Sequence, residues 1–275
     1  MKYWELKRPD IEQMQKDEKV VVVPLGSIEQ HGAHLPIMTD SLIGGEIGER
    51  IEAALPDTVL LLPMQWLGAS HHHLQFPGAI SVPSSVYIDM VYHLCDCLLT
   101  AGFRRIYLLL SHGGNDVPCR EALNRLALDR RDRYDYWLAS GGYWAVAEEA
   151  LRRPEMETAR LTHACEYETA MVQHLRPELV DMDQAQGHCL EVESRYFHPN
   201  GDGPNKVHVA IPFEHLTGVG ALGRPELGTP EKGRILLQAV AEQMVDFVQD
   251  FSRWKRGGSP ADFPFAPAPD SGGAR

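Results

Sequence analysis

A run of strongly apolar residues that ends at a group of acidic and histidine side chains constrains this chain most. Residues 20–25 (VVVVPL) predict a buried strand, and Glu29, His31, His34 and Asp40 follow closely. Residues two apart in an extended segment point to the same side, so Glu29 and His31 can face one point. Because α/β proteins bind ligands at the carboxyl ends of strands, we expect a functional cluster here. The simpler alternative is a capped helix start beside a surface histidine.

Strand-like and helix-like segments alternate through the first half of the chain. This alternation predicts βαβ units and an α/β fold with a mostly parallel central sheet. The expected strands are residues 20–25, 59–62, 105–110 and 134–139, and the expected helices are residues 9–17, 41–55, 84–100 and 117–131.

The second half is less regular. Residues 181–230 are rich in Gly and Pro and predict mostly loop, with a short strand signal at residues 207–211. Helices are expected at residues 144–152, 162–175 and 230–254, the last with Thr229 as its N-cap. We expect one domain over residues 1–256 and a flexible Pro/Gly/Ala-rich tail over residues 257–275.

Composition narrows the class of partner. Thirty-eight acidic against 26 basic residues give a net charge of −12, which disfavours nucleic acid and anionic lipid as partners. No apolar run approaches the ~20 residues of a membrane span, and the polar N-terminal stretch lacks a secretory signal. Five loosely spaced cysteines indicate reduced thiols. A cytoplasmic protein that acts on a small molecule is therefore expected.

A second group of polar residues, Ser111-His112-Gly113-Gly114-Asn115, follows the expected third strand. The glycines allow a sharp turn and close approach to a ligand. Neighbouring parallel strands end at the same edge, so His112 is expected beside the Glu29 loop. A solvent-exposed turn histidine is the alternative.

A third group begins the helix expected at residues 162–175. Residues three apart share a helix face, so His163 and Glu166 are expected to project together, with Glu168 elsewhere. Either glutamate would also be favoured by the positive end of the helix dipole without any function. Glu166 is the preferred candidate.

Together these groups supply a mixed set of imidazole and carboxylate ligands. Such a set suits zinc, manganese or ferrous iron better than calcium. Five ligands are too many for one catalytic ion with an open position, but they suit two ions bridged by a carboxylate and a hydroxide. The predicted metal ligands are Glu29, His31, Asp40, His112 and Glu166.

Four motifs, GSIEQHGAHLPIMTD, FPGAIS, SHGGN and HACEYET, make residues 18–185 resemble the creatininase (creatinine amidohydrolase) family, and its HGGN-type branch in particular. The resemblance implies an α/β/α sandwich, a two-metal site and homo-oligomers such as dimers or hexamers. It also implies hydrolysis of C–N bonds in cyclic or formyl amides.

The resemblance also implies roles for single residues. Glu29 and His112 would hold one metal, His31 would hold the second, and Asp40 would bridge the two. Gly114 stands where creatininase itself carries a further carboxylate ligand. The replacement would be Glu166, with Glu168 as the alternative, and His163 matches the catalytic histidine.

Three further residues are expected near the substrate. Ser70 and His73 match a serine and a histidine of the family's loop, although the run His71–His73 is equally compatible with surface exposure. Trp144, with Trp137 and Tyr143, would form an aromatic wall, unless these rings are ordinary core packing.

The sequence therefore predicts a binuclear metal hydrolase with two divalent ions per chain, zinc first and manganese or iron next. A metal-bridging hydroxide would attack the carbonyl of a small cyclic amide or formamide, and His163 would protonate the leaving group. One alternative is hydrolysis of a sugar-derived cyclic ketone or lactone, without C–N cleavage. Another is a metal-binding family member that has lost catalysis.

Overall fold

A four-stranded parallel sheet forms the centre of the computed structural model, which describes residues 1–131 and 135–254. The strand order is β2–β1–β3–β4, and all three strand pairs are parallel. The strands are β1 Val20–Leu25, β2 Val59–Leu61, β3 Arg105–Leu110 and β4 Trp137–Gly142. The helices are α1 Arg8–Gln13, α2 Thr39–Ala54, α3 Ser84–Thr100, α4 Asp116–Asp129, α5 Tyr143–Val146, α6 Glu148–Leu151, α7 Glu166–Leu175, α8 Phe213–Leu216 and α9 Pro230–Ser252.

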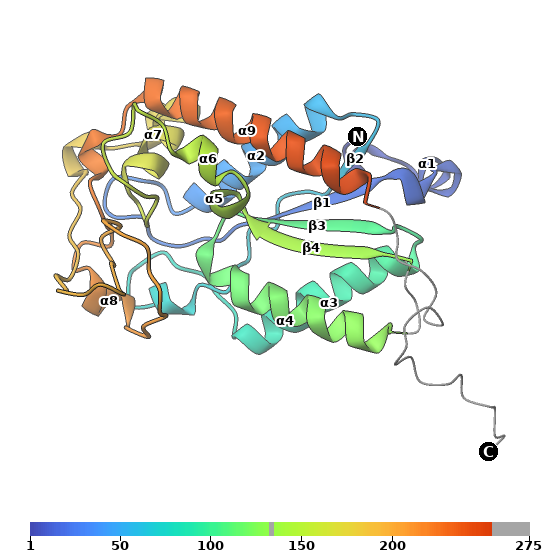
Figure 1. Cartoon of the computed structure of the whole chain (residues 1–275), viewed down its shortest axis with the longest axis horizontal. Helices are drawn as coiled ribbons and strands as arrows, with labels where there is room; N and C mark the ends of the chain where they lie inside the picture. The colour runs from blue at the N-terminus through green and yellow to red at the C-terminus, as the bar shows by residue number, and fades with distance from the viewer. Residues whose placement is uncertain (132–134, 255–275) are drawn as a thin grey trace, which may run out of the picture.

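Alternation along β1 builds two separate cores. Val20 and Val22 point into the core shared with α2, α7 and α9, whereas Val21 and Val23 point into the core shared with α3 and α4. Figure 1 shows these two helical layers on opposite faces of the sheet. The α/β/α arrangement expected from the sequence is confirmed, and the sheet is parallel throughout the described strands.

The last long helix, α9, covers the first of these faces. Its N-cap is Thr229, whose hydroxyl oxygen accepts a hydrogen bond from the Lys232 backbone N–H at 3.2 Å. Its buried residues recur at helical spacing and pack against α2 and α7, which carry candidate site residues. The buried stripe includes Leu236, Leu237, Val240, Met244 and Val248.

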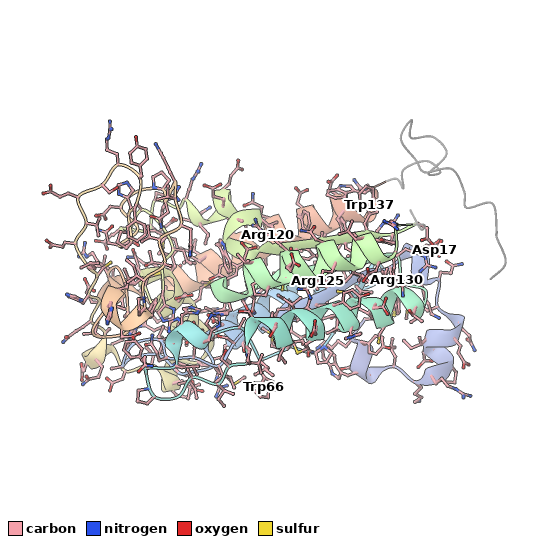
Figure 2. The ribbon with its side chains drawn as sticks, turned by 90° about the horizontal axis from the view of Figure 1, so that it is seen from below. Asp17, Trp66, Arg120, Arg125, Arg130 and Trp137 are labelled. Atoms are coloured by element: carbon pink, nitrogen blue, oxygen red, sulfur yellow. The ribbon has the colours of Figure 1, made fainter. Side chains whose placement is uncertain are left out.

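On the opposite face, Figure 2 labels three arginines: Arg120 and Arg125 of α4, and Arg130, which caps its C-terminal end. Arg125 and Arg130 reach Asp89 and Asp96 of the neighbouring α3. Arg120 pairs with a carboxylate on α4 itself. Each of these three arginines is therefore paired with a carboxylate. Among the described residues, none of the helices combines the length and the apolar character that a membrane span requires.

Several element predictions need correction. The helix expected over residues 162–175 begins only at Glu166, because Ala164 has a left-handed backbone (φ 52°) and Cys165 is the N-cap. The helix expected over residues 144–152 is split into α5 and α6. The fourth strand lies later than expected, at Trp137–Gly142. Residues 181–230 are mostly loop as expected, and the short strand signal at residues 207–211 gives no strand. The predicted tail, residues 257–275, lies outside the described residues.

Candidate metal centre

The candidate site lies at the carboxyl ends of β1 and β3, which are neighbours in the sheet. The helix that follows β1 packs on one face of the sheet, and the helix that follows β3 packs on the other. Such a switch in crossover direction leaves a crevice between the two strand ends. The loop after β1 carries Glu29 and His31, and His112 follows β3. Because β1 and β3 are neighbours in the sheet, the residues that follow their carboxyl ends lie close together.

Glu29, Asp40 and His112 form a first group. His112 Nδ1 lies 3.1 Å from Glu29 Oε2 and 3.0 Å from Asp40 Oδ2. All three residues are buried, with at most 3% exposure, and their ligand atoms lie within 4.8 Å of one another. Burial alone would lower the pKa of His112, but the adjacent charges of Glu29 and Asp40 raise that pKa well above its usual value. An imidazole nitrogen between two carboxylates is suited to share a cation with them.

His31 and Glu168 form a second group around the other oxygen of Asp40. His31 Nε2 lies 3.2 Å from Asp40 Oδ1 and 3.9 Å from Glu168 Oε2. Because Asp40 Oδ2 faces His112 while Oδ1 faces His31, this one carboxylate spans both groups. Ser27 Oγ donates a hydrogen bond to Asp40 Oδ2 at 2.6 Å and fixes its orientation.

A test of whether metal ions fit comes from His31. Its Nε2 is buried and has no hydrogen-bond partner among the described residues, although two carboxylates face it. Burial alone would lower the pKa of His31, but Asp40, Glu168 and Glu29 raise it to about 9. Burial raises the pKa of Glu168 to about 7, with His31 opposing the rise and Asp40 adding to it. Buried carboxylates that destabilise one another are stabilised by divalent cations, so the residues fit two such ions.

Glu166, which the sequence analysis preferred as a ligand, does not reach this group. Its carboxylate accepts hydrogen bonds from the backbone N–H groups of Glu157 and Thr158 and from Lys232 Nζ, at 2.6 Å. The reason is the helix start: because α7 begins at Glu166, His163 lies outside the helix and the expected shared face does not exist. Glu168 instead points into the cluster and accepts from the Ala164 backbone N–H at 2.6 Å.

Ser70 and His73, which the sequence analysis expected near the substrate, both contact Glu29. The Ser70 hydroxyl donates to Glu29 Oε2, and His73 Nε2 lies 3.5 Å from Glu29 Oε1. Ser70 is fully buried, whereas His73 forms part of the cavity wall. Both residues therefore position a predicted metal ligand.

His163 lies against both groups. Its Nδ1 is 3.6 Å from Glu29 Oε1, and its ring centroid is 4.2 Å from that of His31. Burial lowers the pKa of His163 well below its usual value, and the neighbouring His31 and His73 lower it further. A neutral imidazole beside the cluster can exchange a proton with a bound molecule.

A cavity of about 580 Å³ opens onto the cluster. Trp144, which the sequence analysis expected near the substrate, lines this cavity together with Arg160 and Phe213. The Phe213 ring lies 4.1 Å from that of His73. Sequence analysis missed Phe213 because it lies in a stretch read as loop, where no periodicity marks it.

The surroundings of Gly114 leave no room for a side chain, because an added Cβ would lie 2.4 Å from the Ala69 backbone oxygen and 2.4 Å from His112 Nε2. A Cβ added at Gly114 would lie 2.8 Å from His72 Cε1, and the His72 ring stacks on that of His112 with centroids 5.6 Å apart. The imidazole of His72 therefore fills space beside the position where creatininase itself is expected to carry a carboxylate.

The fold and this cluster define a parallel α/β protein with a candidate two-metal centre. The sequence profile of the creatininase family, described as creatinine amidohydrolase, matches residues 4–248. The chain therefore belongs to the creatininase family and is a metal-dependent hydrolase of that family.

Relatives within the family have different named activities. The chain is 26% identical over 245 residues to the mycofactocin precursor peptide peptidase of Mycobacterium ulcerans (strain Agy99), covering 86% of each chain. It is 24% identical over 248 residues to the creatinine amidohydrolase of Pseudomonas putida, covering 84% of this chain and 89% of the relative. Identity is also 24%, over 249 residues, to the 3-dehydro-scyllo-inosose hydrolase of Thermotoga maritima (strain ATCC 43589 / DSM 3109 / JCM 10099 / NBRC 100826 / MSB8), covering 84% and 77%.

Solved structures of creatininase share the fold. A structure described as creatininase Mn superposes with a TM-score of 0.76 at 21% identity, covering 92% of this chain and 98% of the other. A mutant creatininase of the Zn-Zn type gives 0.75 at 21% identity, with the same coverage. The two descriptions name manganese and zinc for those proteins.

Proposed function

We propose that this chain hydrolyses the C–N bond of a small amide, a cyclic amide or a formamide, with two divalent metal ions. The observation that supports this most is the position of Asp40, whose two oxygens face His112 and His31 separately. Two relatives support C–N cleavage by their names, a creatinine amidohydrolase and a precursor peptide peptidase. The SHGGN motif supports, as part of this proposal, membership of the HGGN-type branch.

Under this proposal, Glu29, Asp40 and His112 hold one ion, and His31, Asp40 and Glu168 hold the other. When bound, the two ions would polarise the substrate carbonyl and lower the pKa of water at the site. Zinc is the ion proposed first, because the ligands mix imidazole with carboxylate, and manganese is the next choice. A cytoplasmic homo-oligomer remains part of the proposal.

Residues of the chain transfer the proton and shape the site during hydrolysis. Water adds to the carbonyl carbon and gives one proton to neutral His163. The C–N bond then breaks, and His163 passes that proton to the departing nitrogen. Ser70 and His73 hold Glu29 in place. Trp144 and Phe213 line the cavity and limit the access of bulk water to the cluster.

A second candidate is hydrolysis of a sugar-derived cyclic ketone or lactone. The imidazoles of His72 and His73 line the cavity and offer polar contacts to a hydroxylated ring. The relative from Thermotoga maritima is named for such a substrate.

The experiment is a substrate panel run on protein loaded with zinc or with manganese. The panel contains creatinine, an N-formyl amino acid, a dipeptide and a sugar lactone. We expect amide turnover, with His163→Ala keeping two metals per chain and losing about 10²–10⁴ in rate. Turnover of the lactone alone would favour the second candidate. Two bound metals without any turnover would favour a non-catalytic family member.

A further inference from the structure

Gln30 lies between the predicted ligands Glu29 and His31 and is 5% exposed. Its side-chain amide is oriented by the backbone, because Oε1 accepts a hydrogen bond from the Gly32 N–H at 2.9 Å. A backbone N–H can only donate, so the atom facing it must be the amide oxygen. The amide nitrogen, Nε2, is therefore the atom that faces the histidines.

The first consequence concerns His73. Gln30 Nε2 lies 2.9 Å from His73 Nδ1. Because the amide nitrogen only donates, His73 Nδ1 must accept, and the ring proton must be on Nε2. That protonated Nε2 is the atom 3.5 Å from Glu29 Oε1. A ring nitrogen that carries a proton has no lone pair for a metal ion.

The second consequence concerns His163. Its Nε2 lies 2.9 Å from the backbone oxygen of Gln30, which can only accept, so Nε2 is the donor. The contact between His163 Nε2 and Gln30 Nε2, at 3.2 Å, is then a proximity of two donors and not a hydrogen bond. The lone pair of neutral His163 is consequently on Nδ1, which lies 3.6 Å from Glu29 Oε1.

We propose that Gln30 is a positioning residue that sets the tautomers of His73 and His163 and thereby decides which histidines can bind metal. Three groups of residues in the described structure have metal-ligand spacing, and one of them contains His73. Gln30 removes that group, Glu29–His73–His163, because it makes His73 a donor to Glu29. The other two groups are Glu29–Asp40–His112 and His31–His163–Glu168, and the second lies beside Asp40 through His31. The kinetic part of this inference rests on the proposed amide hydrolysis, but the tautomer part does not.

A loop distant in the sequence, at Gly220, packs against the Gln30 amide. Gly220 (φ 77°) passes so close that an added Cβ would lie 2.1 Å from Gln30 Oε1. The Gly220 carbonyl also accepts from the Gly32 N–H, at 3.1 Å. Only glycine fits this approach, so the loop closes directly over the amide.

The test is nitrogen NMR of ¹⁵N-histidine-labelled, zinc-loaded protein, with the His73 signals assigned through His73→Gln. We expect His73 to carry its proton on Nε2 in the wild-type protein. Gln30→Glu replaces the donor by an acceptor, so we expect the His73 proton to move to Nδ1. Gln238→Glu, an exposed site on α9, makes the same chemical change and should leave His73 unaltered.

Metal content and rate give two further readouts. His73→Gln should keep two zinc ions per chain, because His73 is not a ligand. Gln30→Glu should also keep two, and kcat for an amide substrate should fall by less than about 10²-fold, because the Gln30 backbone oxygen that orients His163 is unchanged. A proton on His73 Nδ1 in the wild type, or loss of zinc in His73→Gln, overturns the inference. If no amide is turned over, the NMR and zinc results still decide it, since neither depends on the substrate.

Discussion

The sharpest prediction separates two glutamates on the first turn of α7. Glu168→Gln should remove one metal ion per chain and leave the fold intact, whereas Glu166→Gln should keep both ions and weaken the fold. The reason is their direction, since Glu168 Oε2 lies 3.9 Å from His31 Nε2, while Glu166 Oε1 lies 2.6 Å from Lys232 Nζ. Glutamine keeps the shape of each side chain and removes its charge.

The two magnitudes follow from these contacts. Without the Glu168 carboxylate, the second ion keeps His31 and Asp40, and affinity should fall by more than the roughly 10–100-fold seen when a supporting residue is lost. Breaking a buried ion pair lowers the free energy of unfolding by about 3–5 kcal/mol. Glu166→Gln should lie near the lower end, because Lys232 still donates to the Leu227 carbonyl and to the Glu157 carboxylate. A loss of about 3 kcal/mol lowers Tm by about 6–12 °C in a chain of this size.

The assay is elemental analysis after dialysis, with thermal unfolding of the same samples in chelator. Metal-free Glu168→Gln should melt no lower than metal-free wild type, because the cost of burying the Glu168 charge exceeds what His31 and the Ala164 N–H return. One metal per chain in Glu166→Gln with two in Glu168→Gln would refute the assignment of both residues.

Three further predictions follow from the same geometry. Asp40→Ala should lose both ions and all hydrolysis, as elemental analysis would show, because Asp40 spans the two groups. Metal-free protein should lose stability in denaturant titrations as pH rises from about 6.5 to about 9. Folding raises the pKa of His31 to about 9, so its stabilising proton is lost across that window. Arg160→Ala should raise KM about 10-fold for substrates that carry a carboxylate, because Arg160 lines the cavity, whereas Arg152 already pairs with Glu148. Equal KM changes for matched carboxylate and amide substrates would contradict this.

Much of the fold could be predicted because strong periodicity marks the elements that build the sheet. β1 and β3 lie at the expected residues, and α3 ends at Thr100 as expected. Strand ends bring Glu29 and His112 together, so two distant motifs could be joined by topology alone. Where Gly and Pro are frequent, as over residues 181–230, mostly loop was expected and the structure has mostly loop.

The choice between Glu166 and Glu168 could not be made from spacing, because it depends on where α7 begins. Because Ala164 has a left-handed backbone, the helix begins only at Glu166. His163 is therefore not helical, and it does not share a helix face with Glu166 as expected. Gln30 was passed over because glutamine carries no charge and binds no metal by itself. Its importance lies in hydrogen-bond direction, which a linear sequence does not display.

The ion pair between Glu166 and Lys232 has a consequence for synthesis on the ribosome. All predicted metal ligands have been synthesised once the chain reaches residue 168. The backbone of residues 157 and 158, next to cavity-lining Arg160, is however hydrogen-bonded to Glu166, which in turn pairs with Lys232 in the first turn of α9. A nascent chain can therefore hold every ligand and still lack the support for one wall of the cavity. Completion of this wall must wait until the last helix has emerged and docked.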